Sequence, residues 1–286
     1  MNRELPVIKP PTATPIFERI GIVGLGLIGG SIALKSRELW PTSLVIAVDN
    51  KDVLETAMRL HAIDVAADDL IVLAECDVVI LAAPVKQNAA ILTELDENVR
   101  TPAVVTDTGS TKREIVAAAK ALPPRFTFVG GHPLAGAARG GLEHARPDIF
   151  QGRPWLLTQH SEALESFIRA LGAEPRVVSV DAHDRLLAFL SHLPQLTASA
   201  LMNVVGEAVG EDGLSLAGRG LADTTRLASS PADIWRDIAA TNADEIGPAL
   251  DALIARLQEL RHDLPNGDQL TEIFDAAARW REHIKR

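Results

Sequence analysis

The stretch IGIVGLGLIGGSIAL (residues 20–34) decides the fold. It begins with an apolar run typical of a buried strand, and Gly24, Gly26 and Gly29 then follow in the spacing G-x-G-x-x-G at the opening of a predicted helix. In such a turn the first glycine permits a tight bend, the second lets the backbone approach a pyrophosphate, and the third allows close helix packing. The stretch predicts a dinucleotide-binding unit, although glycines at this spacing also occur in ordinary turns.

Asp49 supplies the second part of this prediction, because it ends the next predicted strand twenty residues after Gly29. A carboxylate at that place meets the ribose hydroxyls and repels the additional phosphate of NADP, so NAD is the expected cofactor. The positive charge of the nearby Lys51 leaves the preference for NAD over NADP open. Asp49 also fits the alternative role of an ordinary turn residue at the end of a strand. The other expected cofactor-binding residues lie at the helix opening and after a later strand: Leu27, Ile28, Ala83 and Pro84.

Short apolar runs alternate with amphipathic segments over the first half of the chain. The runs RIGIVG, LVIAVD, CDVVILAAP and AVVTDTG are predicted strands, each followed by a predicted helix. This alternation is typical of βαβ units in a parallel sheet, and therefore of an α/β Rossmann domain. Further strands are predicted at FTFVGG, PWLLTQ and PRVVSV, with a helix over about 161–171 between the last two. After Val180 only helical periodicity remains, which predicts an all-α second domain.

The length of 286 residues is comfortable for two domains. We expect a disordered arm at 1–18, because four prolines lie in the first twenty residues, then a nucleotide-binding domain at 19–180 and an all-α domain at 181–286. The single cysteine, Cys76, excludes an intramolecular disulfide and begins an apolar strand, where a buried packing role is expected.

Composition limits the partners. A net charge of −10 argues against nonspecific nucleic-acid binding. The sequence has no run of about eighteen apolar residues that could span a bilayer, and its beginning lacks the pattern of a secretory signal. We therefore expect a cytoplasmic protein that binds a small molecule and neither nucleic acid nor membranes, and we predict no metal site.

Two polar segments, DTGSTK (107–112) and GGHPLAG (130–136), follow later strands at the edge of the sheet where ligands bind. Ser110 can cap the next helix, a role that is compatible with contact to a substrate. His132 lies between glycines and a proline in a predicted loop, and histidine is suited to proton abstraction near neutrality. We predict that His132 and Ser110 are catalytic. The histidines at 61, 144, 160, 262 and 283 lie at predicted surface positions without such a setting.

The helix that begins near Asp181 has one apolar face and one polar, almost uncharged face. The apolar face is expected to be core and contains Leu186, Leu187, Phe189, Leu190, Leu193, Leu196, Leu201, Val204 and Val205. The other face carries Ser191, His192 and Gln195, where a solvated helix would show Lys and Glu. Pro194 frees a carbonyl group four residues earlier, a distortion often found where helices meet ligands. These polar residues therefore line a substrate pocket or pack against a partner helix.

Taken in order, IGIVGLGLIGGS, DTGSTK, GGHPLAG, HDRLLAFLSHLPQ and DTTRLASSPADIWRDI resemble the prephenate/arogenate dehydrogenase family over nearly the whole chain. The resemblance implies a Rossmann domain followed by helices that intertwine into a homodimer, with the active site between the two domains. It also implies a role in tyrosine biosynthesis, through the NAD-dependent oxidative decarboxylation of prephenate to 4-hydroxyphenylpyruvate.

The same resemblance gives roles to individual residues. By similarity His132 is the base hydrogen-bonded to the ring hydroxyl, Ser191 contacts the substrate, and Arg226 in DTTR binds a carboxylate, although a surface ion pair is the ordinary role of a single arginine. Many relatives carry histidine at the place of Gln195. A neutral amide that can donate favours the keto group of prephenate, whereas the ammonium group of arogenate prefers a carboxylate, so arogenate stays as the alternative substrate.

Two other functions fit a Rossmann domain that is joined to helices. A β-hydroxyacid dehydrogenase or imine reductase usually relies on a lysine or tyrosine in the helical domain, but this chain has no tyrosine and no lysine between Lys120 and Lys285. A non-enzymatic NAD-sensing module would not need His132 beside a pocket. The sequence therefore favours the dehydrogenase.

Overall fold

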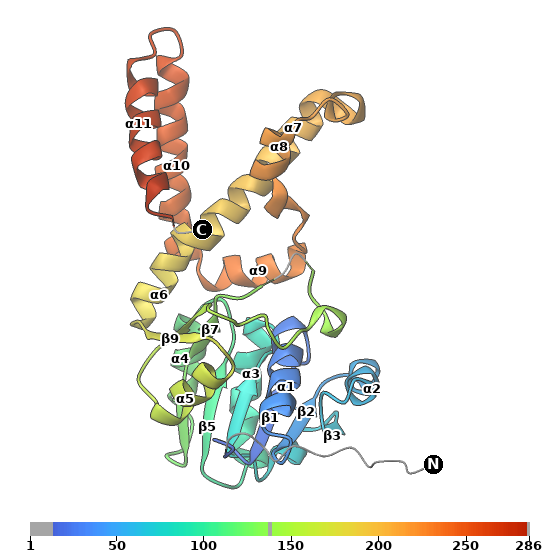
Figure 1. The fold of residues 1–286 in the computed structure, drawn as a ribbon. Coiled ribbons are helices and arrows are strands. Elements are labelled where there is room, and N and C mark those ends of the chain that lie inside the picture. Colours follow the sequence, from blue (N-terminus) through green and yellow to red (C-terminus); the bar gives the residue numbers. More distant parts are fainter. Residues whose placement is uncertain (1–13, 137–138, 285–286) are drawn as a thin grey trace.

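The computed structural model describes residues 14–136 and 139–284, which form a six-stranded sheet, a smaller sheet and a set of helices (Figure 1). The strand order of the large sheet is β3-β2-β1-β4-β5-β6, and all paired neighbours run parallel. This order confirms the predicted nucleotide-binding domain of the α/β class. Its strands are β1 (Arg19–Val23), β2 (Leu44–Val48), β3 (Val65–Ala67), β4 (Val78–Leu81), β5 (Ala103–Asp107) and β6 (Phe126–Val129).

Both faces of this sheet are covered, and alternate residues of one strand enter two different cores. In β4, Val78 and Ile80 belong to one core, whereas Val79 and Leu81 belong to the other. Burial on both faces explains why the strands are continuous apolar runs, and Cys76 is buried beside them as predicted. The connecting elements are α1 (Leu27–Leu39), α2 (Lys51–Arg59), η1 (Leu70–Leu73), α3 (Val85–Asn98) and α4 (Arg113–Ala119).

Phe17 belongs to the core, although the arm was predicted to extend to residue 18. Its ring meets that of Phe167 edge to face at a centroid distance of 5.6 Å, and its carbonyl oxygen accepts a hydrogen bond from Ser43 Oγ at 2.9 Å. Burying a side chain of this size stabilises the fold by about 1.5–3 kcal/mol. The domain therefore begins before Phe17, and residues 1–13 of the predicted arm lie outside the described residues.

Three short strands form the second sheet: β7 (Gly131–Pro133), β8 (Pro154–Leu157) and β9 (Glu174–Val177). The turn η2 (Leu142–His144) precedes β8, and α5 (Glu162–Ala170) lies between β8 and β9 as predicted. His132 lies opposite Leu156 in the antiparallel pair of β7 and β8, so it is held by a strand and not by the predicted loop. The loop prediction was wrong because the partner strand is distant in sequence.

From Val180 to the end of the described residues the chain is helical, as predicted. Helix α9 lies across the nucleotide-binding domain, whereas α7 and the hairpin of α10 and α11 extend away from it in two directions (Figure 1). None of the described helices is long and apolar enough to cross a membrane. The elements are α6 (Val180–Leu187), η3 (Ala188–His192), α7 (Leu193–Leu214), α8 (Arg219–Thr224), η4 (Arg226–Ser229), α9 (Ala232–Thr241), α10 (Ala243–Asp263) and α11 (Asp268–Glu282).

The long helix predicted from about Asp181 is interrupted directly before Pro194. Helix α6 ends at Leu187, the residues of η3 form a π-helical turn, and α7 then begins at Leu193. A proline in a helix leaves the carbonyl group four residues earlier without its partner, and a π-helical turn is one way to accommodate this. The predicted distortion is therefore present, and it reorients the residues around Ser191.

The buried face of this helical segment is the one opposite to the prediction. Asp184, His192 and Gln195 of the polar face are at most 5% exposed, whereas Phe189 and Leu190 of the predicted core are 44% and 68% exposed. Within the described residues the chain itself covers only part of the apolar face, where Leu187 is 4% exposed. The pattern identified an apolar face correctly, but one chain does not bury all of it.

Candidate active site

The glycine-rich turn after β1 has the geometry that a dinucleotide requires. Gly24 has φ +95°, and a Cβ at Gly29 would lie 1.9 Å from the carbonyl oxygen of Gly24, so neither place accepts a side chain. At Gly26, in contrast, a Cβ would meet nothing within 4 Å. The open space above Gly26, at the N-terminus of α1, fits the approach of a pyrophosphate.

Asp49 lies at the end of β2 and turns its carboxylate toward this glycine-rich turn. Its Oδ2 accepts a hydrogen bond from the backbone N–H of Leu25 and its Oδ1 one from that of Asn50, both at 2.6 Å. Asp49, Gly26 and Ala83 line the same cavity, of about 550 Å³. Lys51 is 86% exposed and lies 4.0 Å from Glu55 on its own helix, so it does not neutralise Asp49. The carboxylate is placed to meet ribose hydroxyls.

A second cavity, of about 420 Å³, continues this groove toward the helical domain. Both cavities are lined by Gly26, Ala83 and Pro84, and the second also by Leu27, Ile28 and Ser110. Its far wall is formed by Ser230, Pro231, Ile234, Trp235, Asp237 and Ile238. Of the predicted cofactor-binding residues, all but Gly29 therefore line these two adjoining cavities, and Ser110 lines the second one.

His132 lines a third cavity, of about 360 Å³, together with Ser191. Ala135 and Gly136 line both this cavity and the second one, so the two adjoin. The remaining lining is apolar and comes from β7 and the segment after it, from α6 and from η3, including Leu134, Leu186 and Leu190. The structure thus brings His132 and Ser191 together beside the end of the dinucleotide groove.

His132 is the first member of a chain of hydrogen bonds that reaches into α6. Its Nδ1 lies 2.9 Å from Nε2 of His183, whose Nδ1 lies 2.7 Å from Oδ1 of Asp184. Because a carboxylate only accepts, a neutral His183 carries its proton on Nδ1 and presents Nε2 as an acceptor. His132 therefore donates its Nδ1–H to His183. This fixes the tautomer in which Nε2 of His132 holds a free lone pair.

Within this series of hydrogen bonds, the surroundings favour a neutral His132 and an ionised Asp184. Burial lowers the pKa of His132 well below its ordinary value, and the neighbouring His183, Lys112 and His192 lower it further. Burial opposes the charge on Asp184, but hydrogen bonds from His183 and from the backbone of Arg113 and Lys112 outweigh it and lower the pKa of Asp184. At neutral pH His132 is therefore uncharged, which is the form in which a histidine can act as a proton acceptor.

Asp107, at the end of β5, holds the two polar segments of the site together. It accepts hydrogen bonds from the N–H groups of Gly109 at 2.8 Å and Gly131 at 3.1 Å, and it forms a buried ion pair with Lys112. A Cβ at Gly131 would lie 2.5 Å from the carbonyl oxygen of Asp107, so glycine is needed for this close approach. One carboxylate therefore fixes both the loop of Ser110 and the strand of His132.

The two domains meet at these residues. Asp184 of α6 accepts hydrogen bonds from the N–H groups of Lys112 at 2.8 Å and Arg113 at 2.9 Å, at the start of α4. The side chain of Arg113 pairs with Asp244 and with Glu245 of α10. The carboxylate that orients the histidine chain is thus itself held by the nucleotide-binding domain.

His192 does not line the cavity beside His132. It is 1% exposed, and its Nδ1 lies 3.1 Å from Nδ2 of Asn242, which also donates to the carbonyl oxygen of Asp184 at 2.9 Å. Burial lowers the pKa of His192 to about 4, so the ring is neutral. Its Nε2 is buried without a hydrogen-bond partner among the described residues. His192 therefore supports the helices behind the site.

Gln195 and Arg226 are close to the site but line neither of the two inner cavities. Gln195 is 5% exposed, and its amide group bonds to Leu227 and Ser230. Arg226 begins η4 and is exposed in the single chain. Of the residues predicted to contact the substrate, the structure places Ser191 in the cavity of His132, whereas Gln195, His192 and Arg226 do not line that cavity.

The sequence analysis did not identify the partners of His132. His183, Asp184, Asp107 and Lys112 are each at most 1% exposed, and together they fix its position and charge. One signal in the sequence was available. His183 and Asp184 are adjacent, and they lie in a predicted helical segment shortly before the SHLP motif. Their contact with His132, 51 residues away, is not visible in local periodicity.

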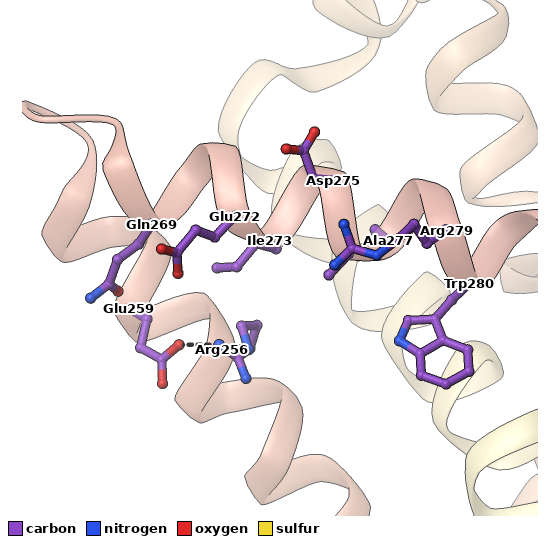
Figure 2. Close-up of a pocket in the computed structure, with 10 residues that line it drawn as sticks. Arg256, Glu259, Gln269, Glu272, Ile273, Asp275, Ala277, Arg279 and Trp280 are labelled. Atoms are coloured by element: carbon purple, nitrogen blue, oxygen red, sulfur yellow. Dashed lines mark hydrogen bonds and ion pairs between the residues drawn. The ribbon is translucent and has the colours of Figure 1, made fainter.

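A further groove lies between α10 and α11 and is distant from these residues (Figure 2). Half of its lining residues are charged, and Arg256 and Glu259 pair with each other at 2.5 Å. The groove contains none of the residues with a lowered pKa described above. We therefore assign no catalytic role to it.

Comparison with known proteins agrees with this arrangement. Residues 32–173 match the family model "Prephenate dehydrogenase, nucleotide-binding domain", and residues 179–276 match "Prephenate dehydrogenase, dimerization domain". The prephenate dehydrogenase of Bacillus subtilis is 33% identical over 282 residues, which are 93% of this chain and 76% of that protein. The cyclohexadienyl dehydrogenase of Zymomonas mobilis is 30% identical over 284 residues, which are 94% of this chain and 97% of that protein.

Among solved structures, this chain is similar to prephenate dehydrogenase from Aquifex aeolicus in complex with hydroxyphenyl propionate and NAD+. The TM-score is 0.87 at 26% sequence identity, and the match covers 96% of this chain and 100% of the other. One family model matches each of the two domains described above, and each of the two relatives extends over both. The chain therefore belongs to the prephenate dehydrogenase family.

Proposed function

We propose that this enzyme catalyses the NAD-dependent oxidative decarboxylation of prephenate to 4-hydroxyphenylpyruvate, in tyrosine biosynthesis. The observation that carries the proposal is the fixed tautomer of His132, whose Nε2 is free to accept a proton beside the inner end of the dinucleotide groove. A module that only senses a nucleotide would not need a base of this kind.

The groove fits NAD. Gly26 leaves room for a pyrophosphate, and Asp49 offers a carboxylate to the ribose hydroxyls without an ion pair in the described part of the chain. An additional phosphate on that ribose would meet the charge of Asp49, so we propose NAD and not NADP as the cofactor. When bound, NAD would take up the hydride that leaves the carbinol carbon of the ring.

The protein then needs to orient the substrate and manage one proton. In our proposal Nε2 of His132 accepts the proton of the ring hydroxyl as the hydride leaves, and it can return that proton to the phenol oxygen. The bond between the ring and its carboxylate breaks, carbon dioxide leaves, and the electron pair makes the ring aromatic. Aromatisation drives the reaction, and a positioned base contributes about 10²- to 10⁴-fold in rate.

Prephenate is favoured over arogenate by the lining of the cavity beside His132. An ammonium group removed from water needs a carboxylate partner, because an unpaired buried charge is costly. Among the described residues that line this cavity none is acidic, and Ser191 is a neutral donor and acceptor. Arogenate, oxidised by the same chemistry, is the second candidate. Ser110 and Arg226 are the proposed additional contacts to the substrate.

The test is to mix the purified protein with NAD and either prephenate or arogenate and to follow the absorbance of the reduced cofactor. We expect turnover of prephenate with a higher kcat/KM than for arogenate. His132→Asn should lower kcat severely and leave the Kd for NAD nearly unchanged, because His132 is remote from Asp49 in the groove. Absence of turnover with both substrates would contradict the proposal, and near-normal kcat in the variant would remove His132 from the base role.

We also propose that the enzyme is a homodimer through its helical domain. Large apolar side chains of α7 and α11 are exposed in the single chain, among them Val204 at 62%, Phe274 at 64% and Trp280 at 74%. Figure 2 shows the side chain of Trp280 on α11. A face of this kind is covered by a partner in stable assemblies. Light scattering after gel filtration should give twice the mass of the chain, and a monomer at micromolar concentration would contradict the proposal.

A further inference from the structure

Gln195 makes an unusual set of hydrogen bonds with a segment more than thirty residues away. Its Nε2 donates to the carbonyl oxygen of Leu227 at 2.7 Å, and its Oε1 accepts from Oγ of Ser230 at 3.1 Å. A weaker contact joins Nε2 to Ser199 Oγ at 3.3 Å on the same helix. The amide therefore uses both of its N–H donors and one of its two acceptor positions on the protein, and it has no free N–H to offer a substrate.

The segment that Gln195 holds connects two parts of the active site. Arg226 directly precedes Leu227, and Ser230 and the following Pro231 line the inner cavity of the dinucleotide groove. The other hydrogen bonds of this segment are local, such as those from Ser230 N to Leu227 O and from Ser229 Oγ to Arg226 O. Within the described residues, Gln195 supplies the hydrogen bonds that join residues 226–230 to α7.

We propose that Gln195 is a positioning residue, which fixes the position of Arg226 and of the cavity wall at Ser230. In this role it does not contact the keto or amino group of the substrate. This inference rests on the proposed function of the site. An amide is suited to the role because one planar group donates to a carbonyl and accepts from a hydroxyl at the same time. The expectation that Gln195 discriminates between prephenate and arogenate requires a free donor, which this arrangement does not leave.

Gln195→Glu tests the proposal, because it replaces the donor to Leu227 with a second acceptor at nearly constant size. A buried hydrogen-bonding group left unpaired should raise the KM for prephenate about ten- to hundredfold. The KM for arogenate should rise by the same factor, so the ratio of the two kcat/KM values should stay within about twofold. The Kd for NAD and the kcat at saturating substrate should change much less than KM.

Two serines provide matched controls. Ser230→Ala removes only the hydroxyl that donates to Gln195, and it should raise KM in the same direction by a smaller factor. Ser199→Ala removes the weak contact within α7 and should leave KM unchanged. If Gln195→Glu fails to fold, Ser230→Ala still tests the link, and normal KM in that variant would overturn the proposal.

A double-mutant cycle with Arg226→Ala identifies the route of the effect. If Gln195 acts by placing Arg226, the Gln195→Glu change should have little further effect on KM in the Arg226→Ala background. Additive effects, or a tenfold shift of the substrate ratio in Gln195→Glu alone, would overturn the proposal. A wild-type enzyme without turnover on either substrate would instead contradict the proposed function, so the two failures are distinguishable.

Discussion

Replacing His183 tests whether the histidine chain sets the reactivity of His132. An asparagine amide nitrogen can take the place of Nδ1 of His183 and keep the bond to Asp184, but it leaves Nδ1–H of His132 without its acceptor. A longer glutamine can place its amide oxygen near the former Nε2 and continue to accept from His132. His183→Asn and His183→Gln therefore form a matched pair.

The magnitude follows from the single hydrogen bond of 2.9 Å that is lost. Leaving a buried polar group unpaired costs about 1–3 kcal/mol. At about 1.4 kcal/mol for each factor of ten, His183→Asn should lower kcat by about five- to 150-fold. His183 also helps to lower the pKa of His132, so its removal should move the acid limb of kcat/KM to higher pH.

The assay is steady-state formation of reduced cofactor over a range of pH, with thermal melting and NAD binding as controls for folding. We expect the asparagine variant to lose clearly more kcat than the glutamine variant, while both bind NAD normally. A kcat within twofold of wild type for His183→Asn would refute the reasoning. Equal losses in both variants, together with weaker NAD binding, would show general disruption of the site.

Three further predictions concern the cofactor, the substrate and pH. Asp49→Ser should raise the affinity for NADP relative to NAD, and a wild type that prefers NADP would contradict the charge argument. Arg226→Ala should mainly raise KM for the substrate, and an unchanged KM would leave Arg226 as a surface residue. Because the pKa of His132 is lowered, kcat/KM should persist as pH falls through about 6.5, and an acid limb above that value would contradict the assignment. The unfolded chain takes up a proton there that the folded chain does not, so calorimetry should show the unfolding free energy falling below about pH 6.5.

Local sequence was sufficient for the parts of the site that one βαβ unit builds. Gly24, Gly26 and Asp49 act through backbone space and through the ends of neighbouring strands, which spacing alone can predict. The strand of His132 and its bond to His183 were not predictable in this way, because each joins segments that are distant in sequence.

The apolar helix face shows a different limit of the sequence. Periodicity indicated that Phe189 and Leu190 share a face, and this is correct. It could not indicate which molecule covers that face, because the same pattern serves a core within one chain and an interface between two. Gln195 likewise was expected to face a pocket, and only the contacts with Leu227 and Ser230 show what its amide bonds.

In the proposed mechanism, the placement of Asp184 makes the orientation of the base depend on domain docking. The dinucleotide groove at Gly26 and Asp49 belongs to the first domain alone, whereas the correct tautomer of His132 depends on a carboxylate that arrives from the second. The backbone amides of Lys112 and Arg113 recruit that carboxylate, so the contact that joins the domains is also the contact that prepares the base. A chain whose two domains are not docked would therefore keep the groove at Gly26 and Asp49 but would lack the carboxylate that orients His132 through His183.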